Sequence, residues 1–419
     1  MRGLSADLSA FDRRLAARSP RPLAVAFSGG GDSLALLLLT KAWADAHGRR
    51  VLALTVDHRL QAASAGWTER CRETAARLGV GFEALAWVGD KPATGLSAAA
   101  RAARHRLLAE AAREGGASAL LMGHTADDLL EAEVMRAEGS TVGDPREWAP
   151  SPVWPEGREV FLLRPLLSLR RAELREWLIS QGQTWIDDPA NENPRSARSR
   201  ARNLLSRHPG RSGAESRDPE SQPGPLGPGS ALQAVRDDGG KEEAGVLVTA
   251  RATLTDREAA AACLCVAGTT APPRRDRLAR LMQQLNGHEP FAATLSGARI
   301  EADADTVHFM REAGRRGLAT IEFAANQPTV WDGRFEITAS EPVTITPLKG
   351  HVSRLPLAER EALKAIPAAA RPTLPAILDP SGAVTCPLLA PHPSVQIRSL
   401  VLARFHAATG QIQSEPSCN

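Results

Sequence analysis

The sequence predicts an α/β protein: a parallel sheet flanked by helices over residues 1–206, followed by smaller α+β structure. At 419 residues the chain exceeds the usual size of one domain. Within its first part, apolar runs typical of buried strands alternate with helix-like stretches, the pattern of a parallel sheet with right-handed crossovers. These runs lie at residues 23–27, 51–56, 82–87 and 119–122.

A glycine-rich turn follows the first run. Residues 28–33 read Ser-Gly-Gly-Gly-Asp-Ser and lead straight into a helix-like run. Glycines without Cβ atoms let backbone N–H groups converge on phosphate oxygens, and the positive end of the helix dipole adds to the attraction. The predicted phosphate-binding residues are Ser28, Gly29, Gly30, Gly31, Asp32 and Ser33. The turn lacks the lysine of a P-loop kinase and the spacing of a dinucleotide fold; a purely structural turn stays open.

Polar residues also follow the second and fourth runs, where an open parallel sheet binds its ligands. Asp57 and His58 follow the second run, and His124 follows the fourth. In a helix that begins near residue 126, Asp127 and Glu131 share a face, with Asp128 beside them. Such a face can hold Mg²⁺ or a substrate ammonium. Compensation of the helix dipole would explain Asp127 and Asp128, but not Glu131 or His124.

Arginines gather in two places of the first part. Arg101 and Arg104 lie three residues apart in the amphipathic stretch 98–113, and Arg198, Arg200 and Arg202 lie within the basic run 195–207. The dense basic run 195–207 suits contacts to RNA phosphates, although a solvated helix face stays open. By themselves, Arg101 and Arg104 indicate only a solvated helix face.

Taken together, these motifs resemble those of the tRNA(Ile)-lysidine synthases, a family of PP-loop ATP pyrophosphatases. The similarity covers about residues 20–205 and includes the 28–33 turn, residues 56–58, the 123–139 block, Arg-Pro-Leu-Leu at 164–167 and residues 187–191. The chain departs from the family pattern at Gln61, Leu129 and Ala132, and His105 stands where the family usually has Tyr.

This resemblance implies a Rossmann-like PP-loop fold and a ligase that uses ATP to adenylate C2 of the wobble cytidine in the CAU anticodon of tRNA(Ile). Free L-lysine then displaces AMP, and the product, lysidine, changes codon reading from AUG to AUA. The resemblance also implies residue roles. Catalysis falls to Asp32, His124, Asp128 and Glu131, the last three near the lysine; ATP binding falls to residues 28–33 with Asp57 and His58; Mg²⁺ falls to Asp32 and Asp127; and tRNA binding falls to Arg101, Arg104, Arg198, Arg200 and Arg202. A base role for His124 is a hypothesis, and a homodimer is left open.

Composition limits the cellular locations and the partners that the sequence suits. Five scattered cysteines without a CxxC pair argue against a disulfide framework or a four-cysteine zinc site, and favour a reducing, cytoplasmic location. The longest strongly apolar run, 34–39, is too short to cross a membrane. The formal net charge of +3 confines nucleic-acid contacts to local patches.

Beyond residue 206, the Pro-, Gly- and Ser-rich stretch 207–245 predicts a disordered linker or insertion. Residues 246–316 predict a small α+β module with helices at 256–266 and 274–285 and β-like runs at 293–301 and 306–311. Residues 317–419 predict a β-rich domain, with a hairpin turn at 331–334, in the position of the family's tRNA-binding domains. The basic residues Arg274, Arg275, Arg277 and Arg280 suit either RNA or solvent.

Two other functions remain open at this stage. One is a different PP-loop enzyme, such as a tRNA thiolase, a GMP synthetase or an asparagine synthetase. Against these, the chain shows neither paired cysteines near the crevice nor a glutaminase segment. The other is a tRNA-binding protein whose nucleotide site is regulatory; it would bind ATP without releasing pyrophosphate.

Overall fold

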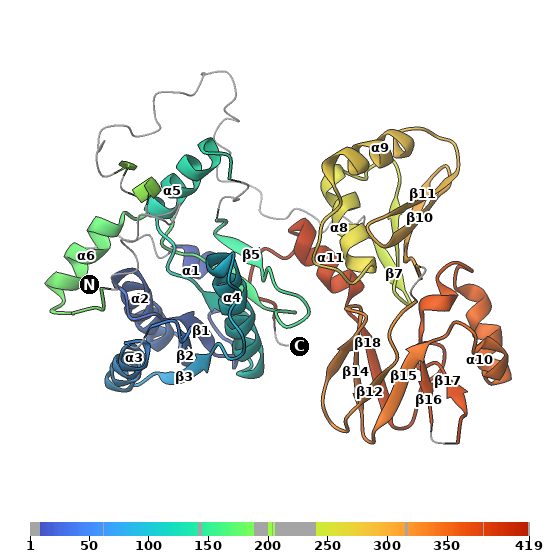
Figure 1. Cartoon of the computed structure of the whole chain (residues 1–419), viewed down its shortest axis with the longest axis horizontal. Coiled ribbons are helices and arrows are strands. Elements are labelled where there is room, and N and C mark those ends of the chain that lie inside the picture. Colours follow the sequence, from blue (N-terminus) through green and yellow to red (C-terminus); the bar gives the residue numbers. More distant parts are fainter. Residues whose placement is uncertain are drawn as a thin grey trace. The chain divides into compact units, whose positions relative to one another are not determined.

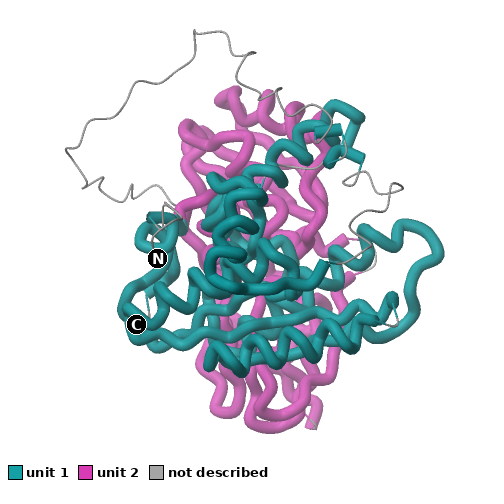
Figure 2. Tube along the Cα trace, turned by 90° about the vertical axis from the view of Figure 1, so that its left-hand side faces the viewer, with its two compact units in different colours: residues 1–231, 412–419 teal, residues 232–411 magenta. Residues whose placement is uncertain are grey.

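The computed structural model describes residues 9–61, 63–140, 145–187, 200–202, 204–205, 240–314, 317–379 and 381–417. The chain forms two compact units, residues 1–231 with 412–419 and residues 232–411 (Figure 2). The predicted modules 246–316 and 317–419 therefore share one unit, apart from residues 412–419, which belong to the first. Arg198 and residues 207–239 of the predicted linker lie outside the described residues.

The first unit alternates strands and helices, as predicted (Figure 1). Its elements are α1 (Ser9–Arg14), β1 (Leu23–Ala26), α2 (Gly31–Ala46), β2 (Val51–Asp57), α3 (Ser64–Leu78), β3 (Gly81–Ala86), α4 (Leu96–Glu114), β4 (Ala119–Leu121), α5 (Ala126–Ala137), β5 (Trp148–Pro150), β6 (Phe161–Leu163) and α6 (Arg171–Ser180).

These strands form one sheet in the order β3-β2-β1-β4-β6-β5, in which only β5 runs antiparallel to its neighbour. The four predicted strands are confirmed to within a residue or two. The strand order reverses between β1 and β4, and a doubly wound sheet binds its ligand at such a switch point. The turns after β1 and β4 therefore flank the expected ligand crevice.

The inner strands β1, β4 and β6 are buried on both faces, which is why they read as continuous apolar runs, whereas the edge strand β3 is partly exposed. On one face Leu23 and Val25 pack into a core with residues of α2, α3 and α6. On the other face Ala24 and Leu120 pack against α4. The helices thereby fix the strand ends and the turns that follow them.

A C-terminal segment completes the first unit. The side chains of Glu415 and Arg49 are fully buried and paired, at 2.6 and 2.9 Å between guanidinium nitrogens and carboxylate oxygens. Ser118 Oγ and the Ala16 amide also donate to Glu415, and Trp148 Nε1 donates to the carbonyl of Ile412. The contacts of Glu415 lie at residues that precede β1, β2 and β4, at the end of the sheet opposite the crevice, whereas Trp148 is the first residue of β5.

The second unit contains three antiparallel sheets. Its first half comprises β7 (Lys241–Glu243), β8 (Val246–Ala250), α8 (Asp256–Val266), α9 (Arg275–Leu285), β9 (Phe291–Leu295), β10 (Ala298–Ala302) and β11 (Thr306–Arg311). Its second half comprises β12 (Ile321–Phe323), β13 (Thr329–Trp331), β14 (Phe335–Ala339), β15 (Val343–Pro347), α10 (Leu357–Ala362), β16 (Pro375–Leu378), β17 (Val384–Thr385), β18 (Val395–Ser399) and α11 (Val401–Thr409), with short 3₁₀ turns at Val352–Arg354, Leu363–Ala365 and Arg371–Thr373.

For this unit the structure corrects two predictions and confirms a third. The run 293–301 was predicted as one β segment and is a hairpin, β9–β10, because Ser296 and Gly297 both adopt positive φ. Residues 241–243, predicted as linker, pair with β8 instead. The hairpin turn at 331–334 is confirmed, with positive φ at Asp332 and Gly333 between β13 and β14. Among the described helices, none is long and apolar enough to cross a membrane.

Candidate nucleotide and amine site

The glycine turn closes on itself through its two serines. The Ser33 hydroxyl donates to the Gly30 carbonyl at 2.9 Å and accepts from the Ser28 amide at 3.2 Å. The two hydroxyl oxygens also lie 3.2 Å apart. Ser28 and Ser33 thus hold the turn in shape at the N-terminus of α2, where helix-end N–H groups favour an anion.

Only one of the three glycines is required by the protein's own packing. Gly29 has a φ of +81°, and a Cβ there would lie 2.5 Å from Ile186 Cδ1. The Ile186 amide also donates to the Gly29 carbonyl at 2.9 Å. At Gly30 and Gly31 an added Cβ would meet its nearest neighbours at 3.7 and 3.6 Å, an ordinary contact. A structural turn therefore accounts for Gly29 but leaves Gly30 and Gly31 unexplained, whereas a close-lying phosphate accounts for both.

Helix α5 begins with a capping box. Asp128 Oδ2 accepts from the amide and the hydroxyl of Thr125, at 2.8 and 3.1 Å. Asp127 instead caps α6: its Oδ2 accepts from the Arg171 amide at 2.7 Å, and its Oδ1 lies 3.0 Å from the Arg170 guanidinium. Both aspartates thus have structural work at helix ends. Glu131, one turn further along α5, caps neither of these two helices.

Arg171 joins the acidic residues of two strand ends. Its Nε donates to Asp32 Oδ2 at 2.9 Å, and its Nη1 donates to Glu131 Oε1 at 3.2 Å. Arg202 Nε donates to the same Glu131 oxygen at 3.0 Å. Glu131 is buried, with 1% of its surface exposed. Burial raises the pKa of Asp32 above its ordinary value, although Arg171 acts in the opposite direction.

His124 is held by a charged donor. Arg164 Nε donates to His124 Nδ1 at 3.2 Å, and Arg164 Nη1 donates to the carbonyl of Arg146. Burial, with a smaller effect of nearby Arg101, lowers the pKa of Arg164 to about 10, so it stays protonated at neutral pH. Since Nδ1 accepts, the proton of the neutral ring lies on Nε2. This arrangement suits His124 as a hydrogen-bond donor and does not suit the base role that we hypothesised.

Asp57 and His58 lie at the carboxyl end of β2. Asp57 Oδ1 accepts from the Arg59 amide at 2.8 Å, which shapes the turn after β2. His58 lies edge-on to Trp87, with ring centroids 6.0 Å apart. Burial, followed by the charge of Arg104, lowers the pKa of His58 below its ordinary value. Its buried Nδ1 has no partner among the described residues.

The four predicted tRNA-binding arginines that the structure describes have different surroundings. Arg101 is exposed and Arg104 partly buried on α4. Arg200 lies 3.7 Å from Glu138, whereas Arg202 reaches into the acidic site at Glu131. Arg202 is thus part of the crevice rather than of an outer basic surface.

No three His, Cys, Asp or Glu side chains of the described residues gather closely enough to hold a metal ion by themselves. Mg²⁺ commonly takes only one or two carboxylates and completes its shell with phosphate oxygens and water. Asp32, beside the glycine turn, fits that use. Asp127 fits it less well, because both of its oxygens already have partners.

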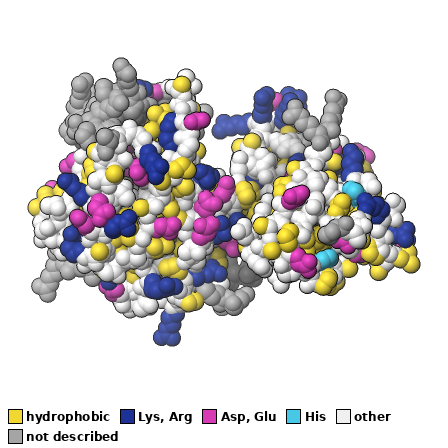
Figure 3. Space-filling view, turned by 60° about the horizontal axis from the view of Figure 1, so that its bottom comes forward, with side chains coloured by type: hydrophobic (Ala, Val, Ile, Leu, Met, Phe, Trp, Pro, Cys, Tyr) yellow, Lys and Arg dark blue, Asp and Glu magenta, His cyan; other side chains and the backbone are white. Residues whose placement is uncertain are grey.

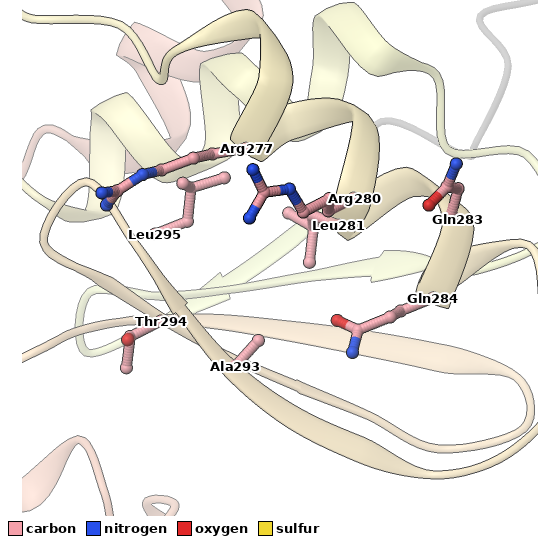
Figure 4. Close-up of a pocket in the computed structure, with 8 residues that line it drawn as sticks. All are labelled: Arg277, Arg280, Leu281, Gln283, Gln284, Ala293, Thr294 and Leu295. Carbon is pink, nitrogen blue, oxygen red and sulfur yellow. The ribbon is translucent and has the colours of Figure 1, made fainter.

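The second unit offers a groove of about 630 Å³ between α9 and β9. In Figure 4, Arg277 and Arg280 lie on the helix above the strand that carries Ala293 and Thr294. Gln283, Gln284, Leu281 and Leu295 complete the lining. On the face that Figure 3 shows, basic side chains are interspersed with acidic ones, as the small net charge suggests.

Sequence reasoning assigned no role to Arg171, Arg164 or Ile186. Arg164 was recognised within a motif, and Arg171 opens the helix after β6. Both follow a strand next to β4, and that position was the available signal. Nothing local in the sequence indicates that Ile186 lies on Gly29.

Comparisons with known proteins place this geometry in context. A family model described as a PP-loop domain matches residues 6–208. The chain is 46% identical over 417 residues to the tRNA(Ile)-lysidine synthase of Caulobacter vibrioides, covering 97% of this chain and 98% of that protein. It is 36% identical to the enzyme of the same name from Hyphomonas neptunium, over 81% of this chain and 96% of that one. Among solved structures, a U34-tRNA thiolase from Methanococcus maripaludis is 19% identical, with a TM-score of 0.39, over 46% of this chain and 69% of that one.

Proposed function

We propose, from the membership of this chain in the tRNA(Ile)-lysidine synthase family, that it ligates lysine to C2 of the wobble cytidine in the CAU anticodon of tRNA(Ile). The observation that carries the proposal is the pairing of two features at one switch point. A glycine turn whose Gly30 and Gly31 leave room for phosphate lies beside a buried acidic side chain, Glu131. Adenylation needs the first feature, and an attacking amine needs the second.

In the first step the turn binds the polyphosphate of ATP. Backbone N–H groups of residues 29–31 and the hydroxyls of Ser28 and Ser33 would contact its oxygens. Asp32 would hold Mg²⁺ there, and this ion supplies charge neutralisation as pyrophosphate leaves. Asp57 and His58, at the neighbouring strand end, would line the rest of the ATP site. Cytidine O2 attacks the α-phosphate, which links AMP to the base and releases pyrophosphate.

In the second step the lysine ε-amine attacks C2 and AMP leaves. Glu131 would bind the ammonium form and take up a proton as the amine becomes nucleophilic. Asp128 adds negative charge at the same helix end. His124, with its proton on Nε2, would donate a hydrogen bond to a substrate oxygen. These roles require the substrates to reach Glu131 past Arg171 and Arg202.

Contacts to the tRNA would come from several basic residues. Arg101 and Arg104 act electrostatically on Arg164 and His58 of the strand ends, and Arg200 lies in the helical residues 200–202. We add the α9–β9 groove of the second unit, since Arg277 and Arg280 beside two glutamines suit a phosphate backbone. The enzyme would work in the cytoplasm, where tRNA and ATP are available. A homodimer remains a prediction, which light scattering tests.

Pyrophosphate release tests the proposal against a regulatory ATP site. With a CAU-anticodon isoleucine tRNA transcript, we expect tRNA-dependent pyrophosphate release that Asp32→Asn abolishes and Asp45→Asn, at the far end of α2, retains. ATP binding without such release would support a regulatory site and contradict the proposal.

A further inference from the structure

Arg171 lies among three carboxylates that the proposed chemistry needs. Its side chain contacts Asp32 at 2.9 Å and Glu131 at 3.2 Å, and its Nη2 lies 3.7 Å from Asp128 Oδ2. These carboxylates come from two elements, α2 and α5, which follow β1 and β4. One guanidinium therefore bridges both sides of the switch point.

The backbone of Arg171 is fixed independently of these contacts. Its amide is the first of α6 and donates to Asp127. The helix is anchored through buried Leu174 and Leu178 in the core of the first unit. The side chain, which is 16% exposed, can change partners without moving the helix that carries it.

Electrostatics explain why a cation occupies this position. Burial opposes the charge of Arg171, but the attraction of Asp32, Glu131 and Asp128 raises its pKa above the ordinary value. Without a cation, the carboxylates of Asp32 and Asp128 would repel each other in a partly buried site. The guanidinium keeps them together.

We propose that Arg171 is a positioning residue and an internal competitor: it fills the cation position between Asp32 and Glu131 when no substrate is bound, and Mg²⁺ and the lysine ammonium replace its contacts on binding. The inference rests on the proposed function, because it assigns those two cations to these carboxylates. Arginine supplies several donors in a planar fork, so it can satisfy carboxylates of two elements at once. Mg²⁺ needs an oxygen of Asp32 and the lysine ammonium needs an oxygen of Glu131, and the Arg171 guanidinium contacts an oxygen of each.

Arg171→Met tests this by calorimetric titration of the full-length protein with MgCl₂ alone and with L-lysine alone. Removing one positive charge at contact distance should tighten binding of each cation about tenfold, allowing for partial solvent exposure. Arg171→Lys, which keeps the charge but not the fork, should bind both cations with affinities between those of wild type and Arg171→Met.

Arg175→Met is the matched control. Arg175 lies one turn further along α6, is half exposed and is 3.8 Å from Asp187. Its charge acts on Asp32 more weakly than that of Arg171, so its loss should change either affinity less than about twofold. Unchanged or weaker cation binding by Arg171→Met, with native circular dichroism, would overturn the inference, and so would equal effects of the two Met variants. Lysidine formation by the wild type is measured separately, and its absence would count against the proposed function instead.

Discussion

Gly29→Ala provides a quantitative test of how residues 185–187 cover the glycine turn. Two costs add at this position. A non-glycine residue at a φ of +81° costs about 1–2 kcal/mol. A Cβ placed 2.5 Å from Ile186 Cδ1 and 3.0 Å from Cys71 Sγ must displace those atoms, and such overpacking costs about 1–3 kcal/mol. The variant should lose about 2–5 kcal/mol of unfolding free energy.

Gly48→Ala separates the two costs. Gly48 follows the other end of α2, has a φ of +64° and would place its Cβ in open space. Gly48→Ala should therefore lower the free energy of unfolding by the backbone cost alone, about 1–2 kcal/mol. Ile186→Val removes the clashing Cδ1, so the double variant Gly29→Ala, Ile186→Val should recover most of the excess over Gly48→Ala.

Urea unfolding followed by circular dichroism measures these differences, with the transition of the first unit analysed by itself, because the two units need not unfold together. If Gly29→Ala costs no more than Gly48→Ala, or if Ile186→Val recovers none of the excess, Ile186 does not pack on the turn as described.

Four further variants test other parts of the structure. Gly30→Ala, at a φ of −71° with no close neighbour, should change stability by less than about 1 kcal/mol. It should nevertheless raise the KM for ATP about tenfold or more, because its methyl would enter the space that we propose for phosphate. Glu131→Gln should raise the KM for lysine at least about tenfold and the KM for ATP less than about threefold, in steady-state kinetics. Glu415→Ala leaves buried Arg49 without its counter-charge and should cost about 3–5 kcal/mol in urea unfolding. Burial lowers the pKa of His105 to about 3, so below pH 6.5 the unfolded chain takes up a proton at this residue that the folded chain does not. Between pH 6.5 and about 5.5 the free energy of unfolding of the wild type should therefore fall by about 1 kcal/mol relative to that of His105→Leu, measured by urea unfolding.

For each of these four variants, one result would contradict the prediction. An unchanged KM for ATP in Gly30→Ala would return the turn to a structural role. Equal effects of Glu131→Gln on both substrates, or the same lysine effect from Glu133→Gln on the exposed side of α5, would remove Glu131 from amine binding. A cost below about 1 kcal/mol for Glu415→Ala would mean that the ion pair is solvated, and parallel pH profiles for wild type and His105→Leu would mean that His105 titrates normally when folded.

The sequence predicted the parts of the site that depend on local pattern. The strands before residues 28 and 123 are short apolar runs, and the turns after them carry polar residues, so both the sheet and its switch point could be derived. The helix start near 126 was predicted for the same reason. These features need only the alternation of the chain and the rule that ligands bind at the carboxyl ends of strands.

The remaining features depend on tertiary structure. Whether Asp127 binds a metal or caps a helix depends on α6, 44 residues away, which supplies the Arg171 amide. The tautomer of His124 depends on Arg164, 40 residues away. Glu415 lies 366 residues from Arg49. The hairpin β9–β10 is a different case, because the Ser296–Gly297 turn was visible in the sequence and was read as strand.

Incorporation of labelled lysine tests the central claim most directly. The enzyme is incubated with ATP, Mg²⁺ and labelled L-lysine together with a CAU-anticodon isoleucine tRNA transcript, and in parallel with the methionine tRNA that has the same anticodon. We expect label in the isoleucine tRNA alone, located at the wobble cytidine by nuclease digestion and mass spectrometry, and absent with Asp32→Asn. Equal label in both tRNAs, or tRNA-dependent pyrophosphate release without any label, would contradict lysidine formation as the function of this protein.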